Sequence, residues 1–337
     1  SRALQHENCR VTNLNLGGNK IDDTGVEHLS RALQHENCRV TNLILDGNKI
    51  DDAGVEHLSR ALEHENCRVT NLILSGNKKI GTTGVEILVR ALQHKNCCVT
   101  NLGSLNAKKL TNIKKIKPLL DANVEKAAAR EEANHEEGED EEEEEQLEEQ
   151  GETKGEEQEQ GRVVKTQNLE VALAALRDPT VTKLVAAGAK FGDEGAGKIA
   201  EGLQHENCRV TNLDLCYNTF GVAGAEHLSH ALQHENCRVV DLRLGGNKIG
   251  AEGVEHLSHA LQHENCRVIS LNLRGNKIGD AGAEILSRAL QHENCRVTNL
   301  NLRENNMRVA AVEHLSRALK HENCRVTNLI LDGNKID

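Results

Sequence analysis

Residues 37–65 read NCRVTNLILDGNKIDDAGVEHLSRALEHE, and this stretch decides the fold because close copies of it fill most of the chain. An Asn-Cys pair marks each copy and recurs every 29 residues within two blocks, except for one interval of 30 where Lys78-Lys79 adds a residue to a loop. A fixed period of this length indicates a solenoid, in which each repeat stacks on its neighbours. The cysteines of these pairs are Cys9, Cys38, Cys67 and Cys97 in the first block and Cys208, Cys237, Cys266, Cys295 and Cys324 in the second.

The first half of each unit predicts a short strand followed by a turn. In the first copy, Val11, Leu14 and Leu16 lie close to alternating positions, and Gly17-Gly18-Asn19 follows them. The second half, residues 23–35, carries apolar side chains at helical spacing. Identical strand–helix units in tandem predict a parallel sheet with helices on one of its faces.

The composition fits such an array and limits the partners. Hydrophobic residues make up 37% of the chain but aromatic residues only 1%, so leucine, valine, isoleucine and alanine must fill the core in similar layers. The net charge of −11 comes from residues 131–160, which hold 17 acidic residues against Lys154, and the rest of the chain is weakly positive. No strong basic stripe and no apolar run of about 18 residues are present, so we expect neither a nucleic-acid nor a membrane partner.

The sequence divides into two repeat blocks around an insertion. Residues 1–105 form the first block, and residues 166–337 form the second. Residues 106–165 comprise a degenerate repeat and an acidic low-complexity insertion, of which 131–160 is expected to be disordered or a charged helix. Neither end carries a polar capping repeat, so we expect a fragment of a longer array or a chain that self-associates through uncapped array ends.

The pattern LxxLxLxxNxI, seen in residues 40–50, 239–249 and 268–278, identifies a family resemblance. With the Gly-Val-Glu-His-Leu helix that follows, it resembles the ribonuclease-inhibitor-like leucine-rich repeats, which occur in NOD-like receptors and in the Ran GTPase-activating protein. The resemblance covers both blocks and implies an α/β fold: a right-handed horseshoe of about ten repeats, with the parallel sheet on its concave face and the helices on its convex face. It also implies a ladder of buried amides after the strands, interrupted by Ala189 and formed by Asn19, Asn48, Asn77, Asn218, Asn247, Asn276, Asn305 and Asn334.

The His-Glu-Asn-Cys tetrapeptide contains residues that could ligate a metal or act in catalysis. A catalytic site is built once, whereas this tetrapeptide recurs in nearly every unit, so we interpret it as a structural element. The pairs His230/His234 and His259/His263 have the i,i+4 spacing of zinc ligands, but no third ligand accompanies them. We therefore expect that the protein is not an enzyme and that it binds neither a cofactor nor a metal ion. Eleven cysteines without a signal peptide favour reduced thiols and a location in the cytoplasm or nucleus.

Variation between the copies is concentrated on the sheet face that points away from the helices. Two outward positions of each strand and its turn differ from copy to copy, whereas the helices are copied almost unchanged. Arginine and tyrosine are favoured anchors of protein interfaces, so the arginines of three successive copies are the best candidates for contact with a partner. The predicted partner-binding residues are Arg243, Arg274, Arg303, Tyr217, Asp214, Asn272, Asn301, Asp46 and Glu304.

These observations predict a non-catalytic scaffold that binds a protein partner, of unknown identity, through its concave face. Two alternatives stay open because of the families that share such repeats. The chain could regulate a small GTPase, as the Ran GTPase-activating protein also combines repeats with an acidic segment, or it could be a ligand-sensing fragment of the NOD-like-receptor type.

Overall fold

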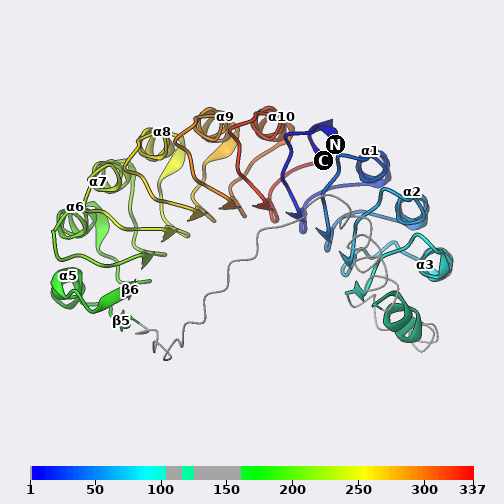
Figure 1. The fold of residues 1–337 in the computed structure, drawn as a ribbon, viewed down its shortest axis with the longest axis horizontal. Helices are drawn as coiled ribbons and strands as arrows, with labels where there is room; N and C mark the ends of the chain where they lie inside the picture. Colours follow the sequence, from blue (N-terminus) through cyan, green and yellow to red (C-terminus); the bar gives the residue numbers. More distant parts are fainter. Residues whose placement is uncertain (1, 104–115, 125–160) are drawn as a thin grey trace, which may run out of the picture.

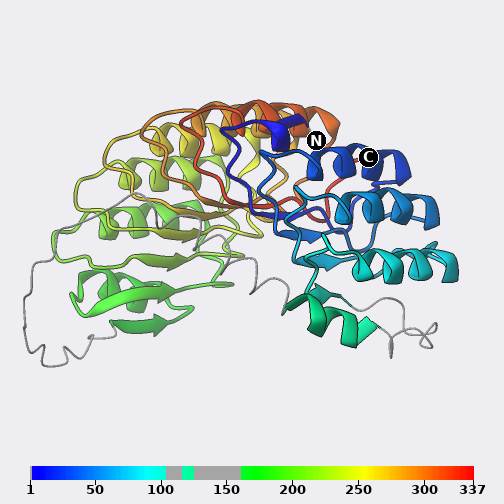
Figure 2. The same ribbon diagram turned by 45° about the vertical axis from the view of Figure 1, so that its right-hand side comes forward.

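The computed structural model describes residues 2–103, 116–124 and 161–337. Within them, strands and helices alternate as the period predicts, and eleven parallel strands form one sheet. The sheet lines the inner side of an arch and the helices cover its outer side (Figures 1 and 2). The acidic stretch 131–160 lies outside the described residues.

Each repeat contributes a strand of about three residues and a helix of about three turns. The first block contains the 3₁₀ helix η1 Arg2–Gln5, then β1 Asn13–Asn15, α1 Asp23–Leu33, β2 Asn42–Ile44, α2 Asp52–Leu62, β3 Asn71–Ile73, α3 Thr82–Gln93 and β4 Asn101–Leu102. The second block contains β5 Arg162–Lys165, α5 Leu169–Arg177, β6 Val181–Val185, α6 Gly192–Leu203, β7 Asn212–Asp214, α7 Val222–Leu232, β8 Asp241–Arg243, α8 Gly250–Leu261, β9 Ser270–Asn272, α9 Gly279–Ala289, β10 Asn299–Asn301, α10 Val309–Ala318 and β11 Asn328–Ile330.

The order of the strands differs from their order in the sequence. The sheet runs β4-β3-β2-β1-β11-β10-β9-β8-β7-β6-β5, so the first and last strands pair in its interior. We call this contact between β1 and β11 the joint. Leu14 is level with Leu329 across the joint, in the same register that Leu14 has with Leu43 on its other side. Each repeat presents the same edge, so the last strand accepts the first as readily as a consecutive one.

The joint corrects one expectation from the sequence. The open ends of the array are not at the chain termini, which lie side by side near the middle of the arch (Figure 1). They are at β4 and β5, the strands that flank the insertion in the sequence.

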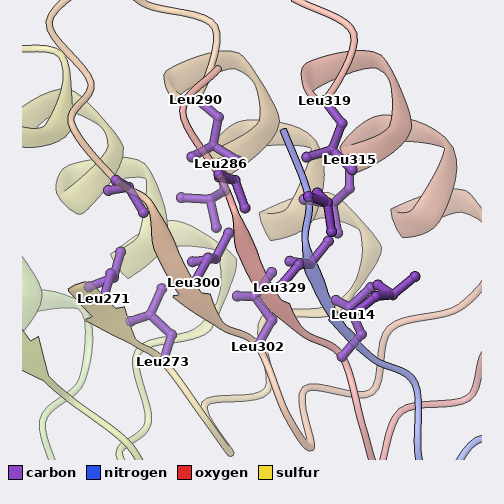
Figure 3. Close-up of a cluster of buried hydrophobic side chains, with 14 of the residues drawn as sticks. Leu14, Leu271, Leu273, Leu286, Leu290, Leu300, Leu302, Leu315, Leu319 and Leu329 are labelled. Atoms are coloured by element: carbon purple, nitrogen blue, oxygen red, sulfur yellow. The ribbon is translucent and has the colours of Figure 1, made fainter. Parts of the chain in front are cut away.

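The core consists of leucine layers that continue through the joint. Strand leucines such as Leu300 and Leu329 point toward helix leucines such as Leu286 and Leu315 (Figure 3). Leu14 of the first strand lies beside this cluster and is 6% exposed. Burying one leucine side chain contributes about 1.5–3 kcal/mol, so the repeated layers carry most of the stability.

The predicted asparagine ladder is confirmed and ties each repeat to the next. Asn48 Nδ2 donates to the carbonyl oxygens of Leu45 and Leu16, both at 3.0 Å, and Asn48 Oδ1 accepts from Ile21 N at 3.1 Å. The ladder continues across the joint, where Asn19 Oδ1 accepts from Ile336 N at 3.2 Å. Buried backbone groups at the turns thus find partners in the amides, as burial requires.

The His-Glu-Asn-Cys tetrapeptide is a second structural connection, as the sequence predicted. His35 Nδ1 accepts from Asn37 N at 3.2 Å, and Asn37 Nδ2 donates to Gln5 O of the preceding repeat at 3.2 Å. Cys38 is buried beneath this turn. His234 makes the same bond to Asn236 N, so one member of the His230/His234 pair already has a structural task.

Candidate functional site on the concave face

The variable positions lie where the sequence placed them, on the strands and turns of the inner face. The central residue of each regular strand is a buried leucine that points toward the helices, and its two neighbours are at least partly exposed. The third strand residue and the residue two positions later therefore form two rows across the sheet. From β7 to β10 the first row holds Asp214, Arg243, Asn272 and Asn301, and the second row holds Cys216, Gly245, Arg274 and Arg303.

Two of the three predicted arginines are joined by one carboxylate. Arg274 Nη2 lies 3.1 Å from Glu304 Oε2, and Arg303 Nε lies 3.0 Å from Glu304 Oε1. Arg303 also pairs with Asp332 Oδ2 at 3.1 Å. We call Arg274, Arg303, Glu304 and Asp332 the charge network. It spans β9, β10 and β11, next to the joint.

Arg243 is separate from the charge network. Its Nη2 and Nε lie 2.9 and 3.2 Å from Oδ2 of Asp241, which belongs to the same strand and the same face of the sheet. Asp241 and Asp332 were not predicted from the sequence as partners of these arginines. The spacing of two residues between Asp241 and Arg243 on one strand was a usable signal, whereas the pairing of Asp332 depends on which strand lies beside β10.

These contacts shift the pKa values of the charged side chains on this face. The hydrogen bond with Asp241 raises the pKa of Arg243, and the hydrogen bond with Glu304 raises the pKa of Arg274. Burial opposes ionisation of Glu304, but hydrogen bonds from Arg303 and Arg274 outweigh it and lower its pKa. Burial raises the pKa of Asp332, whose Oδ1 is buried without a hydrogen-bond partner. The arginines are therefore neutralised locally, and the face is not a basic surface.

Tyr217 and Glu304 occupy a backbone position that favours glycine. Their φ angles are 57° and 56°, where the equivalent residues of most other repeats are glycines such as Gly246 and Gly275. A non-glycine residue in this region costs about 1–2 kcal/mol. The ring of Tyr217 lies against Gly246, where a Cβ atom would collide with it, and Tyr217 is 56% exposed. Tyr217 is therefore a large exposed aromatic residue that sits on a strained backbone in the turn after β7.

Three other predicted residues have a local structural task. The side-chain oxygens of Asp214, Asn272 and Asn301 each accept from the backbone N–H two residues later, at 3.0 Å. These bonds fix the turns that position Cys216, Arg274 and Arg303. Asp46 lies in the turn after β2, on the other side of the joint from the charge network. Its carboxylate occupies the space beside Gly17, so a Cβ atom at position 17 would collide with it. Asp46 makes no ion pair with any described arginine of the network.

Comparisons with known proteins agree with this architecture. A sequence profile described as Leucine Rich repeat matches residues 7–30, 235–258 and 264–287. A search of the curated proteins found no match.

A comparison with solved structures gives matches at 15–17% identity. They include the actin-binding site 2 of leiomodin-1 (17% identity, 46% of this chain and 86% of that one, TM-score 0.37). The C-terminal domain of a Caenorhabditis elegans tropomodulin is 15% identical over 46% of this chain and 93% of that one, with a TM-score of 0.36. An internalin from Listeria monocytogenes is 15% identical over 97% of this chain and 82% of that one, with a TM-score of 0.25.

Two absences hold for residues 2–103, 116–124 and 161–337. No helix there is both long and apolar enough to cross a membrane. No group of three or more histidine, cysteine or acidic side chains there has the arrangement of a metal site.

Proposed function

This chain belongs to the leucine-rich-repeat family, and we propose that it is a non-catalytic scaffold that binds a protein partner through the concave face of its sheet. The observation that carries the proposal is the charge network together with the exposed Tyr217 on the same side of the array. Arginine and tyrosine are enriched among the few residues that dominate the binding energy of protein interfaces, and here both lie on the variable face of an otherwise uniform array.

The ion pairs of the network can be exchanged for ion pairs with a partner. The side chains of Arg274, Arg303 and Glu304 are 39–42% exposed, and pairs of this exposure contribute about 0–1 kcal/mol to stability. A carboxylate on the partner can therefore replace Glu304 at little cost. Asp332 is held in a more buried position and keeps Arg303 oriented.

The binding residues we propose fall into two groups. Tyr217, Arg243, Arg274, Arg303 and Glu304 contact the partner directly, and Asp46 extends this surface beyond the joint. Asp214, Asn272 and Asn301 hold the turns that present them. A partner with interspersed acidic and basic groups fits this surface better than a uniformly charged one, because both signs are present on it.

The test is an affinity pull-down from native lysate with three full-length baits. The first is the unaltered chain, and the second carries Arg243→Glu, Arg274→Glu and Arg303→Glu. The third is a matched control with Arg238→Glu, Arg267→Glu and Arg296→Glu, which reverses three exposed arginines in the segments that precede β8, β9 and β10 of the same repeats.

We expect one protein to be captured by the unaltered chain and the control but lost from the concave variant. Its affinity is then measured with both purified proteins at two salt concentrations, since exchanged ion pairs weaken with salt. Equal capture by all three baits would contradict the concave-face proposal.

A further inference from the structure

The sheet ends at β5, and within the described residues the outer edge of this strand is open. There β5 lies at one end of the arch and pairs with β6 alone (Figure 1). The N–H groups of Arg162 and Thr166 donate toward β6, at 2.8 and 2.9 Å. Successive backbone groups of a strand point to opposite sides, so the N–H and C=O groups of Val163 and Lys165 point to the open edge.

The hydrophobic core is incomplete at this end of the sheet. Val164 is level with Leu184 of β6 and therefore points toward the helices. Leu184 is 0% exposed, whereas Val164 is only half-buried. Leu169 and Leu173 of α5 are also half-buried against the core, and Val163 is 48% exposed. A further strand at this edge therefore buries apolar side chains as well as backbone groups, and both contributions favour its binding.

Two lysines give the open edge a positive charge. Lys165 of β5 and Lys183 of β6 flank the inward-pointing Val164 and Leu184 in sequence, so both lie on the concave face. Arg162 is paired with Asp178 at 2.9 Å, but neither lysine has an ion pair among the described residues. Complementary charge orients association, so this edge favours a strand with carboxylates.

The same charges disfavour a second copy of β5 as the added strand. Two copies related by a two-fold axis pair antiparallel, which brings Arg162 of one copy opposite Lys165 of the other. Like charges directly opposite each other on paired strands are destabilising, and lysine on an edge strand is a known means of preventing such association.

We propose that the open edge of β5 binds an extended acidic segment of a partner protein as an added strand. The main chain of this segment pairs with Val163 and Lys165, as in complexes where a peptide extends a sheet. Its alternate side chains point to opposite faces, so carboxylates meet Lys165 and Lys183 while apolar side chains meet Val164. The charge network lies on β9, β10 and β11, so this site does not rest on the function proposed above.

The probe is a fluorescein-labelled peptide of sequence TELEVET, in which carboxylates and apolar residues alternate. It is titrated with the full chain and followed by fluorescence anisotropy. A control peptide, TKLKVKT, keeps the pattern and reverses the charge. One protein variant carries Lys165→Glu and Lys183→Glu. Its matched control carries Lys248→Glu and Lys277→Glu, two exposed lysines in the turns after β8 and β9.

A second pair of variants tests the backbone bonds. Val163→Pro removes the N–H group that points to the open edge and keeps the bonds to β6 that Arg162 and Thr166 donate. Val163→Ala shortens the side chain and keeps this N–H group. Thermal melts of all four variants establish that they fold.

We expect TELEVET to bind the unaltered chain and the Lys248/Lys277 control equally. It should bind the Lys165/Lys183 variant about tenfold more weakly, and its binding to the unaltered chain should weaken at high salt. The Val163→Ala variant should bind and the Val163→Pro variant should not. Hydrogen exchange at Val163 and Lys165 should be fast in the free chain and slow with the peptide bound.

Several results would overturn the proposal. They are no binding at millimolar TELEVET, equally tight binding of TKLKVKT, and equal binding to the two Val163 variants. Slow hydrogen exchange at Val163 and Lys165 in the free chain would show that the chain itself already pairs with this edge. A dimer that the peptide dissociates would assign the edge to a second copy, which also contradicts a partner's strand.

Discussion

At the scale of single residues, Tyr217 shows where this repeat array departs from its own pattern. Its backbone adopts a left-handed conformation with φ 57°, at the turn position that most repeats fill with glycine. Strain of this kind persists only where the surrounding structure enforces it, and it is concentrated at functional sites. The turn geometry is set by the repeat, so the tyrosine must accept a conformation that suits it poorly.

Two substitutions distinguish the effect of the strained backbone at Tyr217 from the effect of its aromatic ring. Tyr217→Ala removes the ring and keeps a Cβ atom in the left-handed region, whereas Tyr217→Gly removes both. We expect the glycine variant to be more stable than the alanine variant by about 1–2 kcal/mol in urea denaturation. Both should bind the concave-face partner equally weakly. Equal stability of the two variants would show that the backbone is not strained.

The buried cysteines predict how stability responds to alkaline pH. Burial raises the pKa of Cys67 to about 12 and of Cys237 and Cys295 to about 11. In the unfolded chain these thiols lose their protons near pH 8.5, so above that pH the folded state binds more protons than the unfolded state. The free energy of unfolding therefore stays level below pH 8.5 and falls as the pH rises toward 11.

The slope is about 1.4 kcal/mol per pH unit for each such thiol. Urea denaturation at pH 8, 9 and 10 measures it. Cys237→Ala should have a lower free energy of unfolding at pH 8. Its free energy of unfolding should also fall less steeply as the pH rises, because one buried thiol no longer contributes to the slope. An unchanged slope in this variant would mean that the thiols are not the cause.

At the scale of elements, the asparagine ladder holds each turn in place. Asn276 is 0% exposed, and its Nδ2 donates to Leu244 O at 2.9 Å and Leu273 O at 3.0 Å. Asn276→Ala leaves both carbonyls buried with a lost donor. An unsatisfied buried group costs about 1–3 kcal/mol, so we expect the two carbonyls together to lower the free energy of unfolding by at least about 2 kcal/mol in urea denaturation.

Asn276→Asp is the informative companion because it keeps the shape and the acceptor but cannot donate when ionised. It should be at least as damaging as alanine. An aspartate variant with the stability of the unaltered chain would show that the donated bonds contribute little.

The sequence predicts the elements well and their order in space poorly. The period locates each strand and helix because leucine spacing and the turn glycine are local signals, as in residues 37–65. The charge network is not predictable in the same way. Glu304 reaches Arg274 because it stands at the turn position of the adjacent repeat, and Asp332 reaches Arg303 because β11 lies beside β10. The joint leaves no sequence signal, since every repeat edge is alike.

At the scale of the whole molecule, the joint makes the sheet and the core continuous between the two blocks, although β1 and β11 stand far apart in the sequence. β1 and β11 pair in the register of consecutive repeats, and the buried leucines and asparagine amides cross from one block to the other. The two blocks are therefore held together by non-covalent contacts at the joint and by the covalent connection through residues 104–160. These two links can be separated by experiment.

A protease site placed within residues 131–160 allows the covalent link to be cut. If the joint holds the blocks, the cut chain should elute from size-exclusion chromatography as one species of the uncut mass, 37.0 kDa. Asn19→Ala should promote separation of the cut blocks, because Asn19 bonds to Leu331 O and Ile336 N across the joint. Asn48→Ala removes equivalent bonds between β1 and β2, which stay on one fragment, and should not. Two fragments that separate without either substitution would show that the blocks do not stack through their first and last strands.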